Sequence, residues 1–238
     1  MTVLRFVFVV VFACALASPV AADDVLDWNA IIVREVTRPG AVPGPLHFRA
    51  SAIVHTAMFD ALNGIERRYT QIHVAADAPR GASRRAAVVQ AAYTALSAVV
   101  PSAELDDELD DSLGKIAADD AVETSESIAR GRLWGEQVAL EILAWRAADP
   151  LGQTMPPATG DNAPGQWRPT PPGFAAMAVP GMGDHEPWVI ESVLDFRPAA
   201  PLSLTSAEYA SELELVRSLG ALNSGTRTPD QTESARFW

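Results

Sequence analysis

The sequence predicts an all-α protein, a helical bundle that carries a long Pro/Gly-rich irregular segment. Apolar residues recur at spacings of three and four along several stretches, as they do on one face of a helix. No stretch keeps the period-two alternation of a half-buried strand. One internal stretch, 149–201, holds 11 of the 18 prolines and 6 of the 15 glycines and therefore predicts irregular structure.

Residues 1–22 are typical of a secretory signal peptide. Arg5 precedes twelve apolar residues that end at Ala17, and Ala22 closes a small-residue cleavage site. Twelve apolar residues are too few to span a bilayer, which needs roughly 20. The alternatives are an uncleaved anchor, a buried core helix or a lipoprotein signal ending at Cys14. We expect an exported protein, periplasmic or extracellular, with no integral membrane span after signal removal.

Composition excludes several kinds of site. Cleavage of the signal peptide would remove Cys14, the only cysteine, so the mature chain would have no disulfide and no thiol nucleophile. The formal net charge is −12, from 30 acidic and 18 basic residues. Binding nucleic acid requires basic residues that neutralise phosphates, so we expect no nucleic-acid partner.

Residues 23–148 are expected to form five helices, half of a bundle. The first helix is capped by Asp24 or Asp27 and runs through Val36, and the second starts at Pro45 and is closed by Asn63-Gly64. Ser83 caps the third helix, which Pro101 stops, and Ser102 caps the fourth. The fifth helix runs from about Thr124 to Ala147. In the fifth, Gly131 and Gly135 are expected to permit close helix packing. Membrane dimerisation is disfavoured because the charged Arg132 and Glu136 lie beside them.

Residues 149–201 also carry four large aromatic side chains, which are Trp167, Phe174, Trp188 and Phe196. A disordered linker is poor in such residues. We therefore expect an irregular segment that aromatic anchors pin to the helical body. A mobile linker between two domains is the alternative.

Residues 202–238 are expected to form C-terminal helices. Thr205 to Glu208 read as a capping box, and Thr228, Pro229 and Gln231 supply three start signals for a last helix. That helix reaches Trp238 without a C-cap, and we expect it to be truncated.

Few residues stand out as ligands or catalysts. His47 and His55 lie eight residues apart, about 12 Å along one helix, which is too far to share a zinc ion. His55 is instead expected to be a hydrogen-bonded packing residue. The acidic run from Glu104 to Asp111 lacks the ligand pattern of a calcium loop and predicts a solvated helix face. The glycine-containing stretch from Gly181 to Glu186 predicts only a loop.

Several segments together resemble the N-terminal half of bacterial vanadium-dependent haloperoxidase-like proteins, in the type-2 phosphatidic acid phosphatase superfamily. The segments, in order, are Leu26-Asp27-Trp28-Asn29, the ten residues from Val54 to Asn63, Asp195-Phe196-Arg197-Pro198, the six residues from Arg227 to Thr232, and Phe237-Trp238. The resemblance implies an all-helical fold. In complete members it also implies a pocket that binds vanadate as cofactor or phosphate as substrate.

The catalytic motifs of that superfamily are missing from this sequence. They are a Lys with Arg-Pro seven residues later, then Ser-Gly-His, then an Arg followed by a His. Arg-Pro occurs at Arg38, Arg168 and Arg197, but Ile31, Asp161 and Ile190 stand seven residues earlier. The only lysine, Lys115, has no Arg-Pro after it, and Ser224-Gly225 precedes Thr226. The resemblance therefore assigns no catalytic, cofactor-binding or metal residue in this chain, and the catalytic half is expected to be absent.

Three functional hypotheses follow. The first is an incomplete exported haloperoxidase-like or phosphatase-like protein that is inactive alone and whose partner is its own missing C-terminal catalytic half. The second is a non-enzymatic exported helical module that binds a partner. The third is an unrelated acidic enzyme that uses a carboxylate pair, although none of the 30 acidic residues is singled out.

Overall fold

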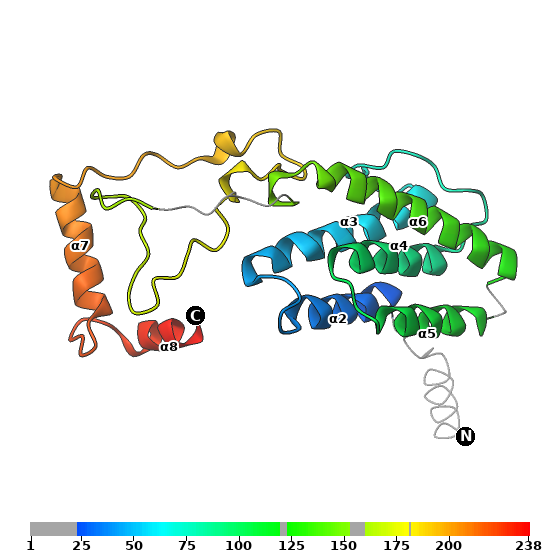
Figure 1. Ribbon diagram of the computed structural model, residues 1–238, viewed down its shortest axis with the longest axis horizontal. Coiled ribbons are helices and arrows are strands. Elements are labelled where there is room, and N and C mark those ends of the chain that lie inside the picture. The colour runs from blue at the N-terminus through cyan, green and yellow to red at the C-terminus, as the bar shows by residue number, and fades with distance from the viewer. Residues whose placement is uncertain (1–22, 120–122, 153–159, 181) are drawn as a thin grey trace, which may run out of the picture. The chain divides into compact units, whose positions relative to one another are not determined.

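A computed structural model describes residues 23–119, 123–152, 160–180 and 182–238. The predicted signal peptide lies outside the described residues. The chain divides into two compact units, Met1–Ala158 with Ala176–Val189 and Thr159–Ala175 with Ile190–Trp238, and each is described by itself. The described residues form seven α-helices and no strand, which confirms the all-α prediction (Figure 1).

The described residues of the first unit form five α-helices: α2 (Asp24–Thr37), α3 (His47–Glu66), α4 (Arg84–Val99), α5 (Leu105–Ala117) and α6 (Ser125–Ala147). Helix α4 contacts each of the other four and lies at the centre of the unit (Figure 1). Its buried residues are distributed around most of the helix and include five alanines. A helix that is apolar on all sides belongs in a core, and small side chains allow its neighbours to approach closely.

Close packing between α4 and α6 depends on the two glycines singled out in the sequence. A Cβ atom at Gly131 would lie 2.5 Å from the carbonyl oxygen of Ser83, and one at Gly135 would overlap the carbonyl oxygen of Ala87. Ala87 is fully buried. Both glycines therefore permit close helix packing, as the sequence predicted.

The helix ends confirm several predicted signals and correct others. Ser83 and Thr124 cap α4 and α6, because each side chain accepts a hydrogen bond from a backbone N–H of the first turn. Helix α2 is capped by Asp23, whereas the sequence predicted Asp24 or Asp27. Helix α3 continues past Asn63-Gly64 and ends at Glu66, where Arg67 adopts a left-handed conformation with φ of 54°.

The N-terminus of α5 also differs from the prediction. The capping position is Glu104, and the predicted cap Ser102 lies two residues earlier, where its hydroxyl accepts a hydrogen bond from Glu104 N at 3.4 Å. Only Leu105, Leu109 and Ile116 are buried in α5. The acidic residues between them face away from the core, as expected of a solvated face.

Within residues 149–201 the described residues form three short 3₁₀ turns: Pro150–Gly152, Met182–Asp184 and Val193–Phe196. Trp188 packs against the core of the first unit, with its ring 5.3 Å from that of Trp145. The other three expected anchors, Trp167, Phe174 and Phe196, are exposed. One aromatic residue of the four therefore anchors the segment.

The second unit contains α7 (Ala207–Gly220) and α8 (Pro229–Phe237). Ser206 caps α7 without the predicted box from Thr205, whereas Thr228 and Gln231 form the predicted capping box of α8. Arg227 joins the two helices, because its guanidinium donates to the carbonyl oxygen of Leu219 at 2.6 Å and to Thr232 Oγ1 at 3.0 Å. No described residue of this unit is buried.

Across the described part of the chain, no helix combines the length and the apolar character that a membrane crossing would need.

Candidate functional site

Two residues of the segment Val54 to Asn63 build the loop that follows α3. Asp60 is fully buried, and its carboxylate accepts hydrogen bonds from the backbone N–H groups of Ile72, His73 and Val74 at 2.8 to 2.9 Å. Asn63 Oδ1 accepts from the N–H groups of Arg68 and Tyr69. Both side chains therefore satisfy backbone groups of the loop and have a structural role.

His55 lines an apolar pocket between α2 and α3. The pocket has a volume of about 440 Å³, and its walls include Val25, Met58, Phe59, Leu62 and Ile72. His55 Nε2 lies 3.1 Å from Asn29 Oδ1, which requires the proton to be on Nε2. Burial lowers the pKa of His55 and so favours the neutral ring. The expectation of a hydrogen-bonded packing histidine is therefore met, and the same ring forms part of a pocket wall.

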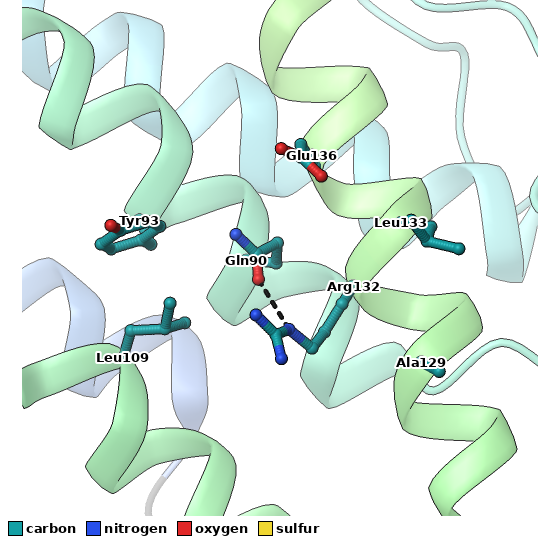
Figure 2. A pocket seen from close by; sticks show the side chains of 7 residues that line it. All are labelled: Gln90, Tyr93, Leu109, Ala129, Arg132, Leu133 and Glu136. Atoms are coloured by element: carbon teal, nitrogen blue, oxygen red, sulfur yellow. Dashed lines mark hydrogen bonds between the residues drawn. The ribbon is translucent and has the colours of Figure 1, made fainter. Parts of the chain in front are cut away.

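A second pocket, of about 530 Å³, lies between α4, α5 and α6 (Figure 2). Gln90 lies on the α4 side, and its side-chain oxygen accepts a hydrogen bond from Arg132 Nε at 2.9 Å. Leu109 and Tyr93 line one side, and Leu133 and Glu136 of α6 line the other. The Tyr93 hydroxyl donates to Asp106 Oδ1 at 2.6 Å, and this hydrogen bond raises the pKa of Tyr93, with burial adding to it.

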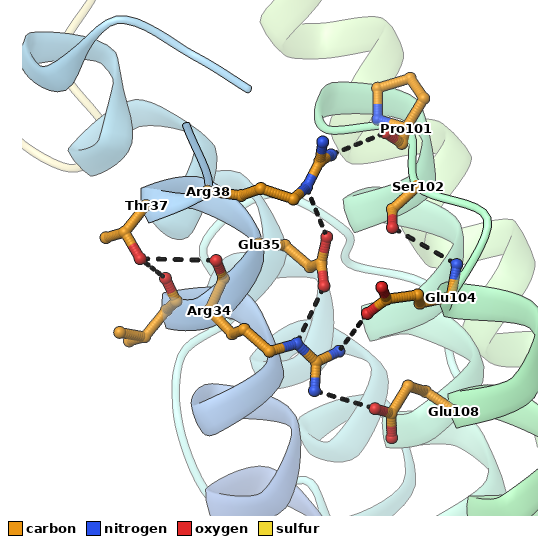
Figure 3. A network of polar contacts seen from close by, with 9 residues as sticks. Arg34, Glu35, Thr37, Arg38, Pro101, Ser102, Glu104 and Glu108 are labelled. Carbon is orange, nitrogen blue, oxygen red and sulfur yellow. Dashed lines mark hydrogen bonds and ion pairs between the residues drawn. The ribbon is translucent and has the colours of Figure 1, made fainter. Parts of the chain in front are cut away.

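A network of charged residues joins α2 to the start of α5 (Figure 3). Glu35 is buried, and its two carboxylate oxygens contact Arg34 Nε at 3.0 Å and Arg38 Nε at 3.3 Å. Burial alone would raise the pKa of Glu35, but hydrogen bonds from Arg34, Ser102 and Arg38 outweigh it and lower that pKa. Arg34 also contacts Glu108 at 2.9 Å. These contacts hold the two helices together and give the network a structural role.

Asp149 is the centre of a cluster of two arginines and a histidine after α6. This buried carboxylate accepts from Arg146 Nη2, lies 3.4 Å from Arg49 Nε and lies 2.9 Å from His185 Nδ1. Burial opposes ionisation of Asp149, but the hydrogen bonds from Arg146 and from Leu151 N, with the nearby charges, lower its pKa. The cluster was not predicted from the sequence, because His185 lies 36 residues beyond Asp149.

Arg146 extends the same cluster into an aromatic contact. Its guanidinium carbon lies 4.7 Å from the ring centre of Trp145 and 4.4 Å from that of Trp188. Two of its nitrogens, Nε and Nη1, are buried without a hydrogen-bond partner. The aromatic faces stabilise this charge in place of water. His73 stacks on the ring of Trp145, with a centroid distance of 4.3 Å.

The Asp149 cluster does not fit an oxyanion such as vanadate. Such a site needs several cationic donors that point at an open position, together with a histidine. Arg49, Arg146 and His185 are suitable donors, but they surround the carboxylate of Asp149, which already supplies the negative charge. The donors Arg146 Nη2 and Arg49 Nε are therefore directed at Asp149 and not at an open position.

The remaining sequence candidates do not converge on one site. His47 Nε2 lies 3.1 Å from the carbonyl oxygen of Val42 and serves the turn before α3. Of the stretch from Gly181 to Glu186, Gly181 lies outside the described residues, and Met182–Asp184 forms a 3₁₀ turn. In the described part of the chain no three or more His, Cys, Asp or Glu side chains gather so that they could hold a metal ion.

Comparison with solved structures identifies a fold relative. The chain superposes on the crystal structure of a bacterial vanadium-dependent iodoperoxidase with a TM-score of 0.68 and 23% sequence identity. The match covers 93% of this chain and 57% of that chain, so this chain spans little more than half of the solved protein. No protein-family model matches the sequence, and no curated protein matches it.

The comparison confirms at the level of the fold the resemblance that the sequence indicated. At 23% identity the match establishes a shared fold. The described helices therefore have the architecture of part of a bacterial vanadium-dependent haloperoxidase.

Proposed function

We propose that this chain is the helical scaffold of an exported haloperoxidase-like or phosphatase-like protein whose oxyanion pocket is formed by residues outside these 238. The observation that carries the proposal is the fold match, which covers nearly all of this chain but 57% of the iodoperoxidase chain. The sequence supports it, because Lys115 is the only lysine and is not followed by Arg-Pro. Vanadate or phosphate would then bind only to a complete protein.

The chain alone is accordingly inactive in this proposal. At Asp149 the donors Arg146 Nη2 and Arg49 Nε are directed at the carboxylate, and Arg34 and Arg38 contact Glu35. Neither cluster supplies the open set of donors that stabilises a bound oxyanion. The catalytic half is the partner that would complete the pocket, and export to the periplasm or medium is part of the same proposal.

The test is an activity assay on the purified chain. We expect no vanadate-dependent oxidation of iodide or bromide and no release of phosphate from a phosphomonoester. The nucleotide sequence after codon 238 gives an independent test. A frame that encodes Lys, six residues and Arg-Pro, followed by Ser-Gly-His, would support the proposal, and turnover by the 238-residue chain would refute it.

A second candidate function is a non-enzymatic module that binds a partner. The observation that favours it is the second unit, in which no described residue is buried and in which Leu213, Val216 and Phe237 are exposed. Apolar side chains exposed in this number are typical of a surface that a partner covers. A monomer that unfolds cooperatively and does not bind an apolar dye would count against this function.

A further inference from the structure

We propose that the outward face of α6 is a docking surface for a basic amphipathic helix of a partner protein. We call this surface the α6 face and define it as Leu133, Glu136, Gln137, Leu140, Glu141 and Ala144. The proposal goes beyond the proposed function, because it concerns binding and needs no oxyanion pocket.

Four residues of the α6 face, three apolar and one a glutamine, have the spacing of a helix–helix seam. Leu133, Gln137, Leu140 and Ala144 follow one another at intervals of four, three and four, the pattern of core positions in a coiled coil. Leu133 is 68% exposed and Leu140 is 54% exposed. The opposite face of α6 is buried against α3 and α4, so these two leucines have no role in the core of the first unit.

The α6 face is continuous with the pocket of Figure 2, because Leu133 and Glu136 line both. On the far side of that pocket, Leu109 of α5 and Tyr93 of α4 add an apolar wall. From Ala129 to Ala144 the two hollows extend about 22 Å along α6, at 1.5 Å per residue. A helix of four turns fits this length and would contact Leu133, Leu140 and Ala144 along its seam.

The charges around this surface select a basic partner. Glu136 and Glu141 flank the leucines, and neither forms an ion pair within the described residues. Asp106 lies at the Tyr93 end, on a helix that carries five carboxylates and one lysine. The nearby cation, Arg132, is held by Gln90. Lysine or arginine beside the apolar stripe of a partner helix would meet these carboxylates.

A second copy of this chain is a poorer occupant of the α6 face. In a parallel pair of α6 helices, Glu136 of one helix would lie opposite Glu141 of the other. In an antiparallel pair centred on Gln137, the two Glu136 side chains would come together. Like charges in these positions destabilise a helix pair.

The test uses a labelled 21-residue synthetic peptide with leucine at the two core positions of each heptad and lysine at the flanking positions. A matched peptide has glutamate in place of lysine. Fluorescence anisotropy with the full chain should show saturable binding of the lysine peptide and at least about tenfold weaker binding of the glutamate peptide. Raising the salt from about 50 to about 300 mM should weaken binding several-fold.

Variants separate docking from charge attraction. The double variant Leu133→Gln/Leu140→Gln should bind the lysine peptide at least about tenfold more weakly, because it removes apolar contacts. Leu26→Gln on α2 is the matched control, since Leu26 is 66% exposed, and it should leave binding unchanged. Glu136→Lys/Glu141→Lys should exchange the preference between the two peptides.

Three results would overturn the proposal. One is equal binding of the lysine peptide by the wild type and by the double leucine variant, which would indicate charge attraction alone. Another is dimerisation of the chain that the double variant abolishes, which would assign the face to a second copy. The third comes from backbone amide NMR of the wild-type chain and needs no variant: peptide-induced shifts that fall outside α6 and its neighbours in Figure 2.

Discussion

A single methyl group added at Gly135 should destabilise the first unit, whereas the same methyl group at Gly114 should stabilise it. Both glycines lie inside helices, in α6 and α5. A Cβ atom at Gly135 would overlap the carbonyl oxygen of Ala87 and lie 3.0 Å from Ala91 N. A Cβ atom at Gly114 would meet nothing within 4 Å. The two substitutions share their chemistry and differ only in what surrounds the new atom.

The expected magnitudes follow from two opposing effects. Replacing glycine by alanine within a helix stabilises it by roughly 1 kcal/mol. At Gly135 the atoms in the way are backbone atoms of α4, which cannot rotate aside, so α4 and α6 must move apart at a cost of about 3 kcal/mol. Gly135→Ala should therefore lower the free energy of unfolding by about 2 kcal/mol. Gly114→Ala should raise it by up to about 1 kcal/mol.

Urea unfolding followed by circular dichroism at 222 nm measures both variants against the wild type. Gly131→Ala should also destabilise, because its Cβ would lie 2.5 Å from the carbonyl oxygen of Ser83. Equal stability of Gly135→Ala and Gly114→Ala would refute the close packing of α4 on α6. So would a Gly135→Ala variant more stable than the wild type.

Three further substitutions have expected outcomes. Glu35→Gln should cost about 2 kcal/mol at pH 7 by urea unfolding. The folded state lowers the pKa of Glu35 below 4.5, so the stabilisation by its carboxylate is complete above pH 4.5. This stabilisation is lost as the pH falls through the lowered pKa. The difference in unfolding free energy between the wild type and Glu35→Gln should therefore be smaller at pH 3. Asp60→Ala should cost about 3 kcal/mol in thermal unfolding, because three buried or partly buried N–H groups lose their acceptor. Trp188→Ala should speed proteolytic cleavage within 176–189 and leave the helical circular dichroism unchanged, because Trp188 packs that segment against Trp145.

Helix positions could be predicted from the sequence because their signals are local. Ser83, Thr124 and Thr228 cap helices through hydrogen bonds to residues three positions later. Where prediction failed by a residue or two, a neighbour competed. Asp23 occupies the capping position of α2 that was predicted for Asp24 or Asp27. Asn63 was predicted to close α3, but its side chain accepts hydrogen bonds from the backbone of the following loop.

The polar clusters could not be predicted because their members are distant in the sequence. Asp149 contacts His185 and Arg49, and Arg49 lies 100 residues before Asp149 in the sequence. Arg132 and Gln90 are 42 residues apart. No pattern in the sequence distinguishes a buried carboxylate such as Asp149 from the solvated ones of α5, since burial depends on how the helices assemble. His55 was expected to pack, but its place in a pocket wall depends on Ile72 and Val25 from other segments.

The most direct test of the central claim is a titration of the purified chain with vanadate, followed by ⁵¹V NMR. The claim is that these 238 residues form a haloperoxidase-like scaffold without the oxyanion pocket. It predicts a vanadate signal that the chain neither broadens nor shifts, and no vanadate-dependent oxidation of iodide. Saturable binding of one vanadate per chain, lost in a variant of Arg49 or His185, would contradict it and would make the Asp149 cluster the anion site.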